Sequence, residues 1–159
     1  MKQLKGLLAV VLLGFIVLSG CKKQDPYDPE KQLAADEQLI KDFLAANNIE
    51  ATRHAQSGVY YQILEEGTGN VAYTANTDVM VKYEGRLLNE QVFDSNTTGV
   101  RLTLGRLIYG WQIGIPLIQK GGKIRLFVPS FYGYGPNPQR GIPANSVLDF
   151  DIELLEIYQ

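Results

Sequence analysis

The sequence predicts an α+β fold, in which an antiparallel β-sheet wraps around one short helix after a signal peptide, a tether and an N-terminal helix. Three observations support this prediction. An apolar run near the N-terminus is too short to span a membrane, and the segment after it has helical periodicity. The second half alternates apolar and polar residues with a period of two. The 16 glycines and 9 tyrosines, concentrated in that half, are typical of a turn-rich domain with an aromatic interior.

The N-terminal segment has the parts of a bacterial lipoprotein signal. A short basic stretch precedes an apolar run over residues 7–18, whereas a membrane-spanning helix needs about 20 apolar residues. The run ends in Leu18-Ser19-Gly20-Cys21, which resembles the lipobox, where cleavage precedes a Cys that then receives lipid. We therefore expect a signal peptide over residues 1–20, palmitate-type lipidation of Cys21, and a membrane-anchored protein of the cell envelope, facing the periplasm or the outer surface. The alternative is an ordinary signal peptide followed by a chance Cys.

Residues 21–58 are expected to form the lipidated tether and one helix. Asp28-Pro29 places a capping residue before a proline at the first helical position, which predicts a helix over residues 29–46. Asn47-Asn48 should end this helix. A polar connector over residues 52–57 contains the only histidine, which is expected to be solvated. The narrow apolar stripe of the helix should pack on the following domain, and it consists of Leu33, Leu39, Ile40, Phe43 and Leu44.

The domain expected over residues 59–159 contains five segments with alternating character. Each predicts a strand with one buried face, as in an antiparallel sheet with one dry side. A short helix is expected over residues 109–117, and Gly121-Gly122 should form the turn after it. The predicted strands are residues 59–64, 79–84, 100–105, 123–128 and 148–155.

Composition and motifs exclude several classes of function. A net charge of −2 with scattered basic residues argues against a nucleic-acid partner. One histidine in a connector leaves no nucleophile–histidine system, and no acidic, His or Cys residues have metal-ligand spacing. Gly133-Tyr134-Gly135 is followed by prolines rather than by a helix that could bind phosphate. We therefore expect neither a metal nor a cofactor.

Six short motifs contain aromatic residues that the strand pattern does not by itself require. Their succession and spacing resemble the FKBP-type peptidyl-prolyl cis-trans isomerase family over residues 77–159, more than half of the chain. A helix followed by Ser57-Gly58-Val59-Tyr60-Tyr61 also resembles the N-terminal extension of lipoprotein members. In chain order the six motifs are Val81-Lys82-Tyr83-Glu84-Gly85, Val92-Phe93-Asp94-Ser95, Leu107-Ile108-Tyr109-Gly110-Trp111, Tyr132-Gly133-Tyr134-Gly135, Gly141-Ile142-Pro143-Ala144-Asn145 and Leu148-Asp149-Phe150-Asp151-Ile152-Glu153-Leu154.

The resemblance implies an enzyme that isomerises X-Pro bonds in proline-containing polypeptides outside the cytoplasm, and an apolar pocket that also accepts macrolide inhibitors. Asp94 and Tyr134 would form its polar, catalytic rim. Trp111 would be its floor, and the backbone N–H of Ile108 would hold a substrate carbonyl. The full set of substrate-binding residues implied in this way is Tyr83, Phe93, Val100, Leu107, Ile108, Trp111, Ile142 and Phe150.

Some positions depart from the family pattern. The segment Ser95–Gly99 is shorter than in many members and lacks an Arg, Val100 stands where an aromatic is common, and Asp149 replaces an apolar residue on the polar face of the last strand. These departures leave open a binding module or chaperone of the same fold without useful turnover. A third alternative is a structural envelope lipoprotein whose helix over residues 29–46 is the working part. On the enzymatic interpretation that helix should be dispensable, because every pocket candidate lies at or beyond Tyr83.

Overall fold

A computed structural model of the chain describes residues 26–159. The predicted signal peptide, the lipidation site at Cys21 and the first residues of the tether lie outside the described residues. No helix within residues 26–159 is long and apolar enough to cross a membrane.

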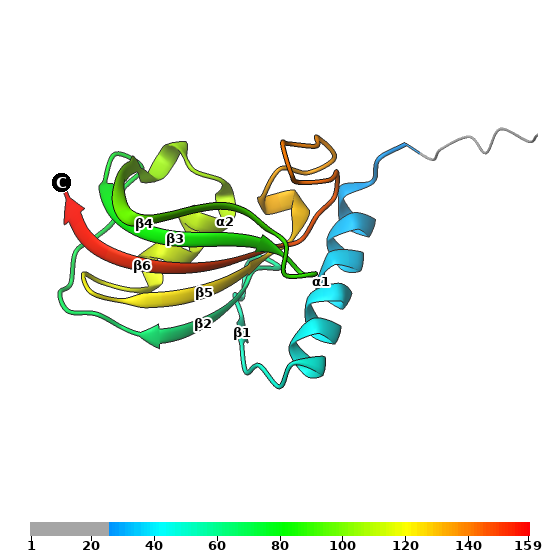
Figure 1. Ribbon diagram of the computed structural model, residues 1–159, viewed down its shortest axis with the longest axis horizontal. Helices are drawn as coiled ribbons and strands as arrows, with labels where there is room; N and C mark the ends of the chain where they lie inside the picture. Colours follow the sequence, from blue (N-terminus) through cyan, green and yellow to red (C-terminus); the bar gives the residue numbers. More distant parts are fainter. Residues whose placement is uncertain (1–25) are drawn as a thin grey trace, which may run out of the picture.

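The described chain forms a six-stranded antiparallel sheet that curls around one short helix, which confirms the predicted fold class (Figure 1). The strand order is β1-β2-β5-β6-β3-β4. The enclosed helix, α2 (Tyr109–Gly114), continues into a 3-10 turn over Ile115–Leu117. The strands are β1 (Thr52–Arg53), β2 (Tyr60–Glu65), β3 (Asp78–Leu87), β4 (Val92–Thr103), β5 (Lys123–Val128) and β6 (Leu148–Tyr158).

Helix α2 lies directly on β5, and two glycines permit this close approach. A Cβ atom on Gly110 would lie 2.4 Å from Cγ1 of Val128, and one on Gly114 would lie 2.5 Å from Cδ1 of Leu126. Both distances are well below the normal contact distance of two carbon atoms. The main core therefore forms between α2 and the inner face of the sheet, and it includes Val79, Val81, Ile115, Ile124, Leu126, Ile152 and Leu154.

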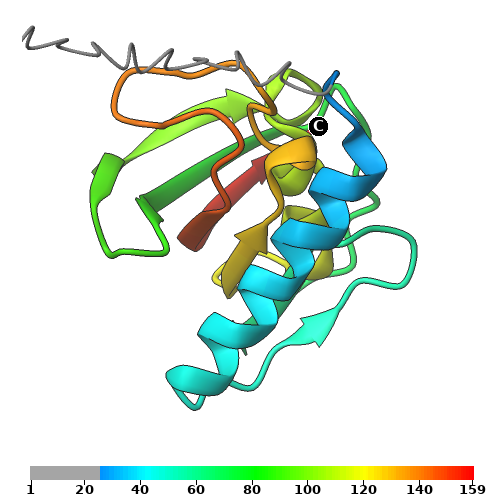
Figure 2. The ribbon, with the colours of Figure 1, turned by 90° about the vertical axis from the view of Figure 1, so that its right-hand side faces the viewer.

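The N-terminal helix, α1 (Pro29–Ala46), has the predicted bounds. The Asp28 side chain caps it by accepting hydrogen bonds from the N–H groups of Glu30 and Lys31, at 3.1 and 3.2 Å. The helix crosses one end of the sheet (Figures 1 and 2). It covers the outer face, because Phe127 packs with α1 in a second core whereas its neighbours in β5 belong to the main core. This second core consists of Ile40, Leu44, Tyr60, Phe127 and Val147.

The predicted apolar stripe of α1 is wrong in one respect. Leu39 is 52% exposed, whereas Asp36 and Ile40 are completely buried and Leu44 is nearly so. These three buried residues are spaced four apart and therefore lie on one face of the helix. A carboxylate thus occupies a position on the docking face that an apolar residue was expected to take.

Strand β4 differs most from the prediction. It begins at Val92 rather than at residue 100, and it ends at Thr103, where a 3-10 turn over Leu104–Arg106 begins. Val81 pairs with Val100 but Tyr83 pairs with Asn96, so two steps along β3 correspond to four along β4. The two extra residues form a bulge. The segment Ser95–Gly99, which lay outside the predicted strands, is therefore part of β4.

The side chain of Asn96 holds this bulge in place. Its Oδ1 accepts hydrogen bonds from the N–H groups of Thr98 and Gly99, at 3.2 and 2.8 Å. Gly99 has a φ of +101°, a conformation that favours glycine.

A smaller correction concerns the connector over residues 52–57, whose first two residues form β1 and pair with β2. His54 in this connector is half-buried, and its Nδ1 lies 3.0 Å from Oγ of Ser57.

Candidate active site

A cavity of about 310 Å³ opens between the inner face of the sheet and the start of α2. Its walls come from β3, β4, α2, β6 and the segment that contains Tyr134. The structure brings together here eight of the ten residues that sequence reasoning assigned to the pocket. They are Tyr83, Phe93, Asp94, Leu107, Ile108, Trp111, Tyr134 and Phe150.

Four aromatic rings form a continuous edge-to-face cluster at the cavity. The centroid of the Trp111 ring lies 5.1 Å from that of Tyr83, at an interplanar angle of 80°, and 5.3 Å from that of Phe150, at 88°. Phe150 in turn contacts Phe93 at 5.6 Å and 88°. Edge-to-face pairs at these distances are favourable beyond the area that they bury. Trp111, which is 5% exposed, contacts two rings and therefore fixes the orientation of the apolar surface.

Gly85 makes room for two of these rings, although sequence reasoning did not assign it to the site. A Cβ atom at this position would lie 2.6 Å from Phe150 and 2.8 Å from two atoms of Phe93. Gly85 also pairs directly with Phe150 in the ladder between β3 and β6. A glycine inside an alternating strand pattern often indicates the close approach of another group, and this signal was available in the sequence.

The polar rim is built around a short hydrogen bond. The Tyr83 hydroxyl donates to Oδ2 of Asp94 at 2.7 Å, and the Asp94 side chain is otherwise exposed. Burial, together with this bond and the negative charge of Asp94, raises the pKa of Tyr83 to about 12. Burial and the same charge also raise the pKa of Tyr134, which is 37% exposed. Both phenols therefore remain protonated hydrogen-bond donors at neutral pH.

Two further donors at the cavity have no partner among residues 26–159. Ile108 is the N-cap of α2, and its backbone N–H makes no hydrogen bond within residues 26–159. Helix N-termini commonly leave such groups free. The indole Nε1 of Trp111 is also buried without a partner in this part of the chain. An aromatic cavity with the unbonded N–H of Ile108 among its lining residues suits a ligand that has both a ring and a carbonyl group.

Two residues assigned to the pocket do not line the cavity. Val100 pairs with Val81 and packs against the main core. Ile142 is 5% exposed and belongs to the same core. The cavity is lined instead by Leu102, two residues beyond Val100 on the same strand, and by Arg106.

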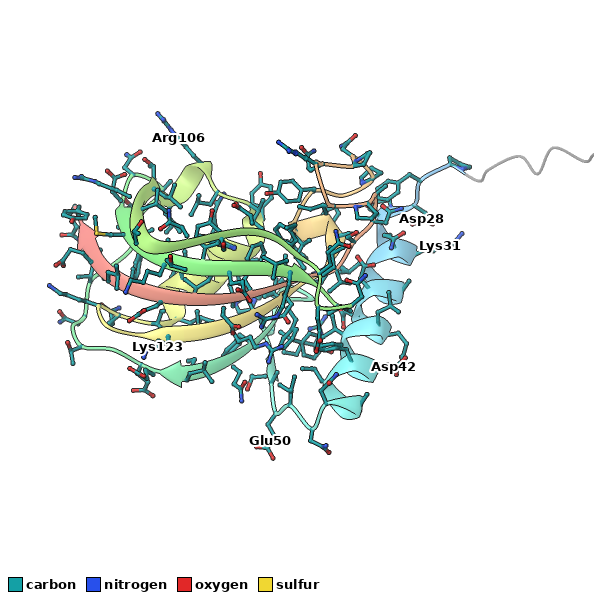
Figure 3. The ribbon with its side chains drawn as sticks, viewed as in Figure 1. Asp28, Lys31, Asp42, Glu50, Arg106 and Lys123 are labelled. Atoms are coloured by element: carbon teal, nitrogen blue, oxygen red, sulfur yellow. The ribbon has the colours of Figure 1, made fainter. Side chains whose placement is uncertain are left out.

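Arg106 lies at the mouth of the cavity, and its side chain points away from the domain (Figure 3). No sequence signal distinguished it from the other scattered basic residues. Within the described residues, no group of three or more His, Cys, Asp or Glu side chains is arranged to hold a metal ion.

Residues 69–155 match the family model of the FKBP-type peptidyl-prolyl cis-trans isomerases. The chain therefore belongs to the FKBP-type peptidyl-prolyl cis-trans isomerase family. It is 46% identical over 104 residues to the FKBP-type isomerase FkpA of Buchnera aphidicola subsp. Schizaphis graminum, covering 64% of this chain and 41% of that protein. It is 41% identical over 106 residues to FkpA of Escherichia coli K12, covering 65% of this chain and 39% of that protein.

Solved structures agree with this assignment. The crystal structure of FkpA from Escherichia coli matches with a TM-score of 0.68 and 34% identity, covering 81% of this chain and 62% of that one. A peptidyl-prolyl cis-trans isomerase from Pseudomonas syringae matches with a TM-score of 0.67 and 29% identity, covering 86% and 100% of the two chains. The chain spans less than half the length of the two FkpA sequences described above.

Proposed function

We propose that this protein is a peptidyl-prolyl cis-trans isomerase that assists the folding of proteins outside the cytoplasm. The observation that supports this proposal most strongly is the aromatic cavity, with Trp111 at its centre and the free N–H of Ile108 at its edge. Family membership makes the same activity the first to test.

The reaction needs no bond to be broken, only rotation about an amide. Resonance holds the X-Pro bond planar with a barrier of about 18–20 kcal/mol, and uncatalysed isomerisation takes tens of seconds or longer. The twisted transition state has lost this resonance, so its carbonyl is less polar than that of the planar amide. A dry aromatic cavity therefore disfavours the planar, well-solvated ground state relative to the twisted state.

Each residue has a role in this mechanism. The proline ring occupies the cavity over Trp111, against Phe93, Leu107 and Phe150, and the N–H of Ile108 holds the carbonyl of a neighbouring peptide bond. Asp94 orients Tyr83 through their hydrogen bond, and Tyr134 provides a second donor at the rim. Asp94 transfers no proton, because the rotation requires none.

A protease-coupled assay on a short X-Pro peptide tests the proposal, using the soluble fragment that begins at Lys22. We expect turnover, and we expect Trp111→Leu to weaken binding of the macrolide FK506 more than it lowers kcat/KM. Tyr109→Leu is the matched control, because Tyr109 lies in the same helix, is 66% exposed and does not line the cavity. Binding of proline-containing peptides without any turnover would instead support the alternative, a chaperone of the same fold.

We also propose that the protein is a lipoprotein attached to a membrane of the cell envelope through Cys21. The apolar run that ends in Leu18-Ser19-Gly20-Cys21 supports this proposal, as does the polar segment that separates it from α1. Signal peptide, tether with helix, and isomerase domain would then occupy residues 1–20, 21–58 and 59–159. Cys21→Ser should abolish labelling with fatty acid and move the protein out of the membrane fraction. Labelling that persists in this variant would refute the lipid anchor.

A further inference from the structure

Asp36 is a buried carboxylate on the sheet-facing side of α1, and both of its oxygens are engaged. Its Oδ2 accepts hydrogen bonds from the backbone N–H of Ser130 at 2.7 Å and from Oγ of Ser130 at 2.6 Å. Its Oδ1 accepts a bond from Nε2 of Gln32 at 2.7 Å. A buried carboxylate requires such compensation, and three good bonds provide it. The bonds to Ser130 connect segments 94 residues apart in the sequence.

Ser130 begins the segment that leads to Tyr134. It is the first residue of a 3-10 turn over Ser130–Tyr132, which lies beside α1 (Figure 2). The carbonyl oxygen of Ser130 accepts hydrogen bonds from the N–H groups of Gly133 and Gly135, at 2.9 and 2.8 Å. These two glycines flank Tyr134 on either side. Asp36 thus binds the N–H and the hydroxyl of Ser130, while the carbonyl of Ser130 binds the backbone on both sides of Tyr134. Ser130 therefore links Asp36 to the segment that contains Tyr134.

We infer that Asp36 is a positioning residue, which places the Tyr134 hydroxyl at the rim of the cavity through the turn that begins at Ser130. The inference rests on the proposed function, since it requires Tyr134 to contact the substrate. It also reverses the expectation that α1 is dispensable for catalysis, because α1 then contributes one end of a hydrogen-bond chain that ends at the active site.

The attachment of α1 to the domain does not depend on Asp36 alone, and this makes the inference testable. Ile40 and Leu44 bury apolar surface against Phe127. Glu37 accepts two hydrogen bonds from the guanidinium group of Arg53 in β1, at 2.9 and 2.7 Å. A variant that weakens these contacts loosens the helix while leaving Asp36 and its partners intact. Loss of helix docking and loss of positioning can therefore be measured separately.

The substitutions are made in the full chain, and kcat/KM is measured where every variant is fully folded. Asp36→Ala should lower kcat/KM about threefold or more, within the range of couplings found inside one hydrogen-bond network. Asp36→Asn should remain near wild type, because its amide oxygen can face Ser130 while the Gln32 amide flips to accept from the new NH₂ group. Ile40→Val, which removes one methyl group from the interface of α1, should also remain near wild type. If Asp36→Ala and Ile40→Val lower kcat/KM equally, Asp36 only docks the helix and the inference is wrong.

Asp42→Ala is the matched control on the same helix. Asp42 accepts a bond from Gln38 at 2.8 Å with the same spacing as the bond from Gln32 to Asp36, but it lies on the side of α1 away from the sheet (Figure 3). We expect this substitution to leave both kcat/KM and the exchange of the Gly133 and Gly135 amides unchanged. Asp36→Ala should accelerate the hydrogen exchange of both amides, as measured by NMR. Unchanged exchange in Asp36→Ala would overturn the inference.

A double-mutant cycle shows whether Asp36 acts through Tyr134. In the Tyr134→Phe background, Asp36→Ala should change kcat/KM less than twofold, because the hydroxyl that it positions is already absent. Equal effects in both backgrounds would refute the inference while leaving the proposed isomerase activity intact. If the wild-type protein binds FK506 without turnover, the proposed catalysis fails, and the same cycle measured on the dissociation constant decides the role of Asp36 separately.

Discussion

The substitution Asp94→Ala distinguishes a catalytic rim from a packed core. We expect kcat/KM to fall by about 10- to 100-fold, while the free energy of unfolding changes by less than about 1 kcal/mol. The two effects differ because Asp94 is exposed, so its removal leaves no cavity and no buried unpaired charge. Its one side-chain hydrogen bond within the described residues comes from the Tyr83 hydroxyl at 2.7 Å.

The magnitude follows from that bond. A hydrogen bond to a charged group contributes about 1.5–3 kcal/mol. Each loss of about 1.36 kcal/mol of transition-state stabilisation lowers the rate tenfold. Without Asp94, the Tyr83 phenol loses both its acceptor and the negative charge that helps to raise its pKa. Burial remains, so the pKa of Tyr83 should fall from about 12 but stay above the ordinary value. The change is therefore visible both in rate and in a tyrosine titration.

The measurement combines the protease-coupled assay, thermal unfolding and an ultraviolet titration of tyrosine. Ser95→Ala is the control, because Ser95 is the exposed neighbour on the same strand and does not line the cavity. An Asp94→Ala protein with normal kcat/KM would remove Asp94 from the catalytic rim. A protein that loses several kcal/mol of stability and activity in parallel would show that Asp94 is structural.

Three further predictions concern the surroundings of the cavity. In Gly85→Ala the new methyl group must push Phe150 by about 0.8 Å to restore an ordinary contact. This substitution should lower the free energy of unfolding by about 1–3 kcal/mol, measured by denaturation, and weaken FK506 binding, measured by titration. Asp149→Ala leaves Arg86 and Arg125 without their shared buried partner and should destabilise the protein by about 3–5 kcal/mol in urea, whereas Asp151→Ala, at a half-exposed site, should have a much smaller effect. Tyr73 and Tyr83 both have a folded pKa of about 12 against an ordinary value of 10, so the folded state holds their protons more tightly. The free energy of unfolding should therefore fall as the pH rises from about 10 through about 12, and it should fall less in Tyr83→Phe than in the wild type. An identical fall in the two proteins would contradict the raised pKa of Tyr83.

The elements predicted best were those with strong local signals. Asp28 and Pro29 specify the start of α1 through side-chain capping and a fixed φ, and the helix begins where they predict. The short helix around Trp111 and the alternating strands were also predicted, because a period of two or of 3.6 depends only on nearby residues. Eight pocket residues were assigned through the family resemblance, and they surround one cavity.

The bulge in β4 could not be predicted in this way. Its position depends on how β4 pairs with β3, a tertiary property, and only Asn96 and Gly99 hinted at an irregular backbone. Leu102, two residues beyond Val100 on the same face of the strand, lines the cavity in place of Val100.

Buried carboxylates were the other feature that the sequence concealed. Asp149 was expected on a polar face, and it does lie on the outer face of β6, yet it is only 1% exposed. Arg86 reaches it from β3 at 2.9 Å, and Arg125 reaches it from β5 at 2.8 Å. Charged residues are rarely buried without partners, and here the partners come from strands distant in the sequence.

The Asp149 network and the cavity occupy opposite faces of the same strand pairs. Asp149 pairs with Arg86 in the ladder between β3 and β6, and the next pair along that ladder is Phe150 with Gly85. A slip of β6 by one residue would place Phe150 on the outer face and Asp149 inside the apolar core, away from Arg86, which is far too unfavourable to occur. The ion pair on the outer face therefore selects the register that directs Phe150 into the cavity. An acidic residue at position 149, in place of an apolar one, thus helps to specify the aromatic site rather than weakening it.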